Sequence, residues 1–208
     1  MSCVFNNNRV LFFDILKSIC AFLIVCIHVP FLGAIGDYIT ALSRIAVPLF
    51  FMITGYFYSD IVEKGGTVKQ IRKILLLFIE ANLLYFLWKL FLAVVNSNIT
   101  SFLKNTFTSN ALIKFLFFNE SPFNGHLWYL GAILYVLIIV LIADKLNCEK
   151  LLYIFTPVLL LGDLILGKYS LVLWSREFPY ILVRNFLFVG IPYFCIGRLI
   201  RAGSGKNI

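Results

Sequence analysis

Residues 11–30 read LFFDILKSICAFLIVCIHVP, and this stretch decides the fold. A run of about 20 mostly apolar residues is long enough for a helix to cross the hydrocarbon core of a membrane, which is roughly 30 Å thick. Asp14 and Lys17 interrupt the run, and no secretory cleavage site follows it. The stretch is therefore predicted to be a retained membrane-spanning helix and not a signal peptide.

Five further runs of this kind follow the first. They lie at residues 41–58, 74–95, 127–143, 151–167 and 180–200. The chain of 208 residues is 61% hydrophobic and only 13% charged, whereas about a quarter of the residues of an average soluble domain are charged. These features predict an all-α protein, a polytopic bundle of about six transmembrane helices that forms a single membrane domain over residues 1–208.

The basic residues predict the orientation of the bundle. The net charge is +8, but Lys and Arg gather in short segments between apolar runs, which is typical of membrane proteins and leaves no basic stripe for a nucleic acid. Ten of them fall on one side: Arg9, Lys64, Lys69, Arg72, Lys73, Lys145, Lys150, Arg198, Arg201 and Lys206. Four fall on the other: Lys104, Lys114, Lys168 and Arg176. By the positive-inside rule both termini are expected in the cytoplasm, in a multi-pass protein of the inner (plasma) membrane.

Ionisable residues inside the membrane are the first candidates for function, because placing them there is costly. Asp14, Lys17 and His28 share one face of the first helix, with spacings of three and eleven residues. The rise of a helix separates Lys17 from His28 by about 16 Å, so the two would serve different parts of a long site. The alternative is structural: Asp14 pairs with Lys17 near the inner interface, and His28 bonds a carbonyl near the outer one.

Polar residues also mark three later helices. The third helix contains Glu80, Asn82 and Lys89, although Lys89 could instead extend to the outer interface. His126 and Trp128 open the fourth helix, and Arg184 and Asn185 begin the sixth. These residues are candidates to line a site. Anchoring at the membrane interface is the alternative for the pairs on the fourth and sixth helices.

The longest loop, at about 96–126, is expected on the outer side. Its segment 111–118, ALIKFLFF, is predicted to lie along the interface as a short amphipathic helix or to re-enter the bundle. The five cysteines are scattered without a C-x-x-C pair, so neither a disulfide framework nor a metal site is expected.

Two of the apolar runs resemble a known family. Residues 13–28, FDILKSICAFLIVCIH, are similar to the opening of acyltransferase-3 proteins, where an acidic and a basic residue precede a helical His. In that family the basic residue is usually Arg, ten residues before the His, and here Lys17 takes its place. Residues 44–57, RIAVPLFFMITGYF, resemble the next family motif over nearly their whole length.

Weaker similarities extend along the chain to about residue 201. HLWYL at 126–130 and the run from Arg184 to Gly197 look like a branch that includes the membrane domain of vancomycin-resistance serine racemases and enterobacterial-antigen acetyltransferases. Lys69, Arg72 and Lys73 are similar to the basic stretch that follows the second helix in the family. Family members are usually longer and contain more helices, so this chain is expected to correspond to their amino-terminal part.

The resemblance implies that an acyl group, commonly acetyl, passes from acyl-CoA to a hydroxyl of a cell-envelope or exported sugar or polysaccharide, a polysaccharide modification by O-acetylation. The coenzyme ester is a substrate, and no permanently bound cofactor is expected. His28 is the expected general base, because an imidazole with an unperturbed pKa of about 6.5 accepts a proton at working pH. The catalytic group is expected to comprise His28, Asp14 and Lys17. The donor is expected to bind Lys17, Lys69, Arg72 and Lys73. The acceptor is expected to meet Arg44, His126, Trp128, Arg184 and Asn185.

Two other classes of function remain open at this point. A small-solute transporter also places ionisable residues inside a membrane, but neither inverted repeats nor paired interrupted helices are visible in this sequence. A non-catalytic membrane module that binds a sugar or an amino acid, or a truncated remnant of an enzyme, is the second alternative.

Overall fold

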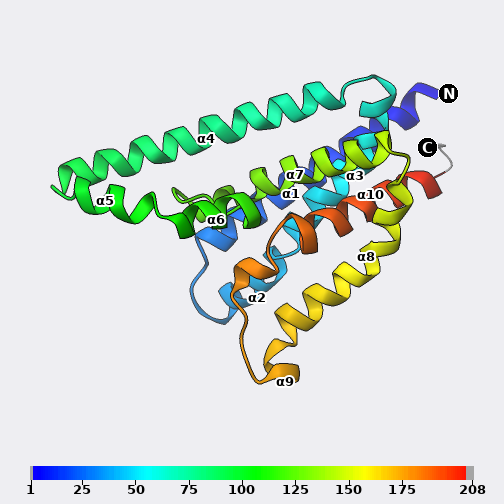
Figure 1. The fold of residues 1–208 in the computed structure, drawn as a ribbon. Helices are drawn as coiled ribbons and strands as arrows, with labels where there is room; N and C mark the ends of the chain where they lie inside the picture. Colours follow the sequence, from blue (N-terminus) through cyan, green and yellow to red (C-terminus); the bar gives the residue numbers. More distant parts are fainter. Residues whose placement is uncertain (1, 205–208) are drawn as a thin grey trace.

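The computed structural model describes residues 2–204, and Figure 1 shows that helices make up this part of the chain. The α-helices are α1 (Ser2–His28), α2 (Gly33–Ser43), α3 (Ala46–Glu63), α4 (Thr67–Val95), α5 (Ile99–Thr106), α6 (Ser109–Phe118), α7 (Trp128–Lys145), α8 (Glu149–Asp163), α9 (Ser170–Trp174) and α10 (Ile191–Gly203). Two short 3-10 helices, η1 (Gly125–Leu127) and η3 (Tyr180–Leu182), and two π-helices, η2 (Leu164–Lys168) and η4 (Phe186–Gly190), join them. No strand occurs within residues 2–204, which confirms the predicted all-α class.

Six helical stretches of the described chain are long and apolar enough to cross a membrane. They are Leu11–His28, Gly33–Glu63, Thr67–Val95, Gly125–Lys145, Glu149–Gly167 and Phe186–Gly203. The prediction of about six spans is thus confirmed, and the predicted interfacial segment 111–118 is helical as part of α6. Several boundaries differ from the prediction. The second span extends from Gly33 to Glu63 because α2 continues into α3 across a turn at Arg44 and Ile45, and the third begins earlier, at Thr67. The sixth begins at Phe186, after Arg184 and Asn185.

The centre of the bundle is α7. It is apolar around its whole circumference, which is typical of a helix surrounded by others, and Ala132, Val136, Leu137 and Val140 along it are fully buried. These side chains form one core with residues of α3 and α10, including Phe194. A second, smaller core joins α1 to α3 through Cys20, Leu23 and Ala46.

Two glycines bring α3 and α10 into backbone contact. A Cβ atom added to Gly55 would collide with the carbonyl oxygen of Phe194, and one added to Gly197 would collide with the carbonyl oxygen of Met52. Small residues allow this kind of approach between membrane helices, where packing replaces the hydrophobic effect as the main attraction. The first and last thirds of the sequence are therefore held together at these two positions.

Two buried ion pairs also fasten α10. Arg198 Nη1 lies 3.1 Å from Asp144 Oδ1 at the end of α7, and Arg201 pairs with Asp60 of α3. The guanidinium carbon of Arg198 lies 5.2 Å from the centre of the Tyr58 ring. Both arginines were counted among the charges that predict orientation, but the structure buries them between helices, where a charge needs a partner. Lys206, counted with them, lies outside the described residues.

The two ends of the described chain lie at one end of the bundle, and the long loop lies at the other. In Figure 1, α4 runs along one side of the central helices and α8 along the other, and these two pack on α7 and α10. The beginning of α1 and the end of α10 lie at the same end, whereas α5 and α6 lie toward the opposite one. An even number of spans produces this arrangement, and the cytoplasmic location of both termini stays a prediction.

Candidate active site

Two predicted site residues from different helices, His28 and His126, are in ring contact. The centres of their imidazole rings are 3.7 Å apart, and the ring planes are inclined by 58°. His28 is the last residue of α1, and the helix ends there because Pro30 follows two residues later and disfavours a helical conformation at Val29. Both histidines are exposed, so a substrate can reach the pair.

His126 is held in place by a series of hydrogen bonds that begins on α4. Ser121 Oγ donates to Asn82 Oδ1 over 2.6 Å, and the same hydroxyl oxygen accepts from the backbone N–H groups of Phe123 and Asn124. Asn124 Oδ1 in turn accepts a hydrogen bond of 2.9 Å from the backbone N–H of His126. Asn82 is itself fixed, because its amide donates to the Phe78 carbonyl. The loop that carries His126 is therefore tied to the wall of the bundle.

Trp128 and Arg184 form the second wall of the site. The guanidinium carbon of Arg184 lies 4.7 Å from the centre of the Trp128 ring, within the range of a cation–π interaction. Trp128 begins α7 and is only 5% exposed, so its ring is a fixed surface for the arginine. Arg184 and His126 also lie near enough to His28 to interact with it electrostatically. The structure thus brings together four residues that the sequence placed on three different helices.

Asn185 holds the backbone next to Arg184. Its Oδ1 accepts hydrogen bonds from the N–H groups of Leu187 and Phe188, at 2.9 and 3.1 Å, and caps the start of η4. Its Nδ2 donates to the carbonyl oxygen of Leu182 over 2.8 Å. The side chain is 4% exposed. These bonds position Arg184, and a direct role of Asn185 in acceptor binding stays a prediction.

Asn119 supports the same region, and the sequence analysis missed it. It ends α6 in a left-handed conformation, with φ of 61°, and is 1% exposed. Its Oδ1 accepts from the Phe186 N–H over 3.4 Å, which links the long loop to η4. Asn is favoured at such a helix end because its side chain tolerates a positive φ. Ser121 and Asn124 were missed as well, although an Asn two residues before His126 has the spacing of an Asx-turn.

The predicted donor residues lie apart from the histidine pair. Lys17 Nζ is 3.5 Å from Asp14 Oδ1, with 44% of the lysine side chain exposed, and it lies 5.4 Å from the centre of the Phe57 ring. The three basic residues on the first two turns of α4 are exposed: Lys69, Arg72 and Lys73. No hydrogen bond or ion pair among the described residues joins them to Lys17. Lys17 and His28 are eleven residues apart on the same helix, so about 16 Å separates them.

Arg44 lies at the junction of α2 and α3 and is exposed. None of the contacts above involves it, so its expected role toward the acceptor stays a prediction. Within the described part of the chain, no group of three or more His, Cys, Asp or Glu side chains is placed to hold a metal ion.

Comparison with known proteins places this arrangement in a family. The family model described as an acyltransferase domain, of the acyltransferase-3 type, matches residues 10–204. No curated protein and no solved structure shows significant similarity to the chain. The match covers all six spans and includes every residue of the histidine site.

Proposed function

The chain belongs to the acyltransferase-3 family, which makes it a membrane acyltransferase in class, and we propose that it transfers an acetyl or related acyl group from acyl-CoA to a hydroxyl of a sugar. The observation that carries the proposal is the meeting of His28, His126 and Arg184 at one end of the bundle. Acyl transfer to an alcohol needs a base for the hydroxyl proton and a positive charge near the carbonyl oxygen. This site offers both.

The reaction at this site would proceed in two steps. His28 removes the proton from the acceptor hydroxyl as its oxygen attacks the carbonyl carbon of the thioester, so that a C–O bond forms and the carbonyl oxygen becomes an oxyanion. The Arg184 guanidinium stabilises this negative charge. The oxyanion then collapses, the C–S bond breaks, and the departing thiolate takes the proton from the His28 imidazolium. The products are an ester and the CoA thiol.

The donor would enter from the end of the bundle that carries the termini. The exposed basic residues of α4, Lys69, Arg72 and Lys73, lie in its first two turns and suit the phosphates of CoA. Lys17 stands between that end and His28, and the pantetheine arm is long enough to cross the gap of about 16 Å between them. In the predicted orientation both termini lie on the cytoplasmic side of the inner membrane, so the donor would enter from the side on which CoA occurs.

The acceptor would approach from the opposite end. His126 and Trp128 offer aromatic faces, on which a sugar ring packs well, and Arg184 lies beside them. Arg44 and Asn185 are the further acceptor residues in this proposal. An envelope or exported polysaccharide fits this geometry. Such an acceptor also agrees with the branch of O-acetyltransferases that the HLWYL run at 126–130 resembles.

The proposal is tested by replacing His28 with Ala and following acetyl transfer from labelled acetyl-CoA in membranes that contain the full chain. General-base catalysis typically contributes about 10²–10⁴-fold, so His28→Ala should lose transfer to that extent. Val29→Ala, at the neighbouring exposed position, is the control and should keep the wild-type rate. Unchanged transfer by His28→Ala at normal protein levels would eliminate the role of His28 as base.

A further inference from the structure

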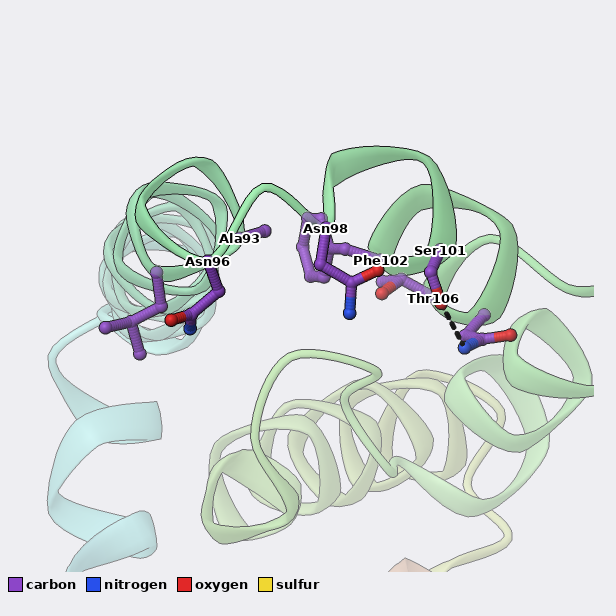
Figure 2. A pocket seen from close by; sticks show the side chains of 8 residues that line it. Ala93, Asn96, Asn98, Ser101, Phe102 and Thr106 are labelled. Atoms are coloured by element: carbon purple, nitrogen blue, oxygen red, sulfur yellow. Dashed lines mark hydrogen bonds between the residues drawn. The ribbon is translucent and has the colours of Figure 1, made fainter.

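A pocket of about 290 Å³ opens between the end of α4 and α5 (Figure 2), and none of the histidine-site residues lines it. Its polar lining consists of amide and hydroxyl side chains, with one aromatic ring beside them. These residues are Asn96, Asn98, Ser101, Asn105, Thr106 and Phe102. No charged side chain takes part in the lining.

Most polar residues of the pocket belong to α5 or to its N-cap Asn98, and Asn96 lies at the end of α4. Asn98, Ser101 and Asn105 follow one another at spacings of three and four, and Asn105 Nδ2 donates to Ser101 Oγ over 3.3 Å, the dashed line in Figure 2. Thr100 and Lys104 occupy the opposite face and do not line the pocket. An eight-residue helix at a membrane surface would gain most by turning such a face to bulk water, yet here it borders a concave space with α4.

The chemistry of the lining selects a neutral ligand with many hydroxyl groups. Each amide presents two donors and one acceptor oxygen, and each hydroxyl can both donate and accept. A ligand with several hydroxyls satisfies these groups, whereas an anion or a cation would find no opposite charge in the pocket. The Phe102 ring, partly buried, provides an apolar surface for the C–H face of a sugar ring.

An aromatic cluster connects the pocket to the histidine site. The Phe102 ring lies 6.2 Å from that of Phe86, and the Phe86 ring lies 5.3 Å from that of Phe123. Phe123 belongs to the loop that leads to His126, so one wall supports both places. A ligand that fills the pocket and a hydroxyl that reaches the histidines would thus lie along the same side of α4.

We propose that this pocket is a second carbohydrate subsite, which binds a neutral sugar residue of the acceptor several residues along the glycan from the one that is acylated. This inference rests on the proposed acyltransferase function and specifies its acceptor as a glycan of more than one residue. The sugar is carried either by a free oligosaccharide or by a glycolipid headgroup, since both present the same hydroxyls to the pocket.

The test uses the full chain in lipid nanodiscs and three probes: cellotriose, tri-N-acetylchitotriose and monoglucosyldiacylglycerol. Saturation-transfer NMR measures the Kd of each. At least one probe should bind the wild type, and the Asn98→Ala/Asn105→Ala double variant should weaken that binding about tenfold, because two hydrogen bonds are lost. Binding of the free trisaccharides assigns the pocket to an oligosaccharide, and binding of the lipid alone assigns it to a glycolipid headgroup.

A second variant and a control complete the design. Ser101→Tyr fills the pocket without removing an amide and should also abolish binding, whereas Thr100→Ala/Lys104→Ala, on the opposite face of α5, should keep the Kd within about twofold. No binding by the wild type, or equal losses in the control, overturns the subsite. His28-dependent release of CoA from acetyl-CoA is measured in parallel: if it persists without sugar binding, only the subsite fails, and if it is absent, the proposed function fails.

Discussion

Ser121 Oγ donates a 2.6 Å hydrogen bond to Asn82 Oδ1, 39 residues earlier in the chain, and this contact joins α4 to the loop that carries His126. The bond lies outside the reacting groups, yet the position of an imidazole depends on it. Asn82 is therefore a positioning residue for the proposed reaction.

Replacing Asn82 with Ala should lower kcat about ten- to a hundredfold and leave the donor KM unchanged, because a displacement of about 1 Å at a reacting group is enough for such a loss. Ser121→Ala should have the same effect, and Ser121→Thr, which keeps the hydroxyl, should restore the rate. Tyr135→Phe is the matched control, since it removes a hydrogen bond of 2.8 Å between α7 and α6 without touching the His126 loop. A loss of kcat in Tyr135→Phe equal to that in Asn82→Ala would show that general loosening is responsible.

His126 should contribute through its ring nitrogens and not only through packing. His126→Ala and His126→Phe should both lower kcat, by about tenfold, less than the loss for His28→Ala, since the base itself remains in place. The Phe variant preserves the aromatic contact with His28 but has no nitrogen. Initial rates of acyl transfer at saturating donor measure the kcat of both variants. Full activity of His126→Phe would show that His126 gives only steric support.

Lys17 should act on the donor and not on the chemical step. Lys17→Ala should raise the donor KM about fivefold with little change in kcat, because a charge contact present before and during the reaction affects binding alone. Lys17→Arg should retain the wild-type KM. Lys145→Ala, an exposed lysine at the end of α7, serves as the control for general loss of positive charge. A large fall in kcat at constant KM would contradict the assignment.

Gly55 and Gly197 should tolerate no larger residue. Gly55→Ala or Gly197→Ala would push a methyl group into a backbone carbonyl, and we expect a loss of at least about 2 kcal/mol of stability, as for overpacking in a dense core. Gly203→Ala, which meets open space at the end of α10, should be neutral. Thermal unfolding in detergent measures all three, and a Gly55→Ala protein as stable as the wild type would exclude the close contact between α3 and α10.

Arg198 should be essential to stability as long as Asp144 remains. Arg198→Met leaves the partly buried Asp144 carboxylate, 22% exposed, without its partner, and we expect a loss below the roughly 3–5 kcal/mol that is typical of a fully buried pair. The double variant Asp144→Leu/Arg198→Met should recover more than half of that loss, since no unpaired charge is left. Lys150→Met, an exposed position, is the control. Urea unfolding measures the stability of each variant, and a double variant less stable than Arg198→Met would contradict the prediction.

The spans were predictable because hydropathy alone identifies a membrane helix, and the two motifs on the first and second runs carried the family. The sequence predicted that His28 and His126 belong to the same site, but it did not predict that their rings are in contact. The sequence indicated that each residue lies near the outer end of a helix, and helices that end on the same side can bring such residues together. The contact itself depends on how α1 and α7 pack, which hydropathy does not encode.

The ion pairs of α10 show what sequence reasoning could not reach. Arg198 and Arg201 stand near the end of an apolar run, where an exposed interfacial charge is the usual situation. Their partners, Asp144 and Asp60, lie on helices far away in the sequence, and each looks like an ordinary acidic residue at a helix end. Only the packing of α10 against α3 and α7 makes them neighbours. The supporting asparagine Asn119 escaped notice for the same reason, because its partner is on η4.

The contact of Gly55 with Phe194 also sets an order of events during synthesis. The ribosome delivers α3 to the membrane long before α10, so three further spans enter the bilayer while the contact of Gly55 with Phe194 and the pair of Asp60 with Arg201 are still missing. Insertion of individual helices therefore precedes closure of the bundle, as in two-stage assembly of membrane proteins. The core of α3 and α7 is completed only by α10, and until α10 arrives α3 depends on lipids or on the insertion machinery for shelter.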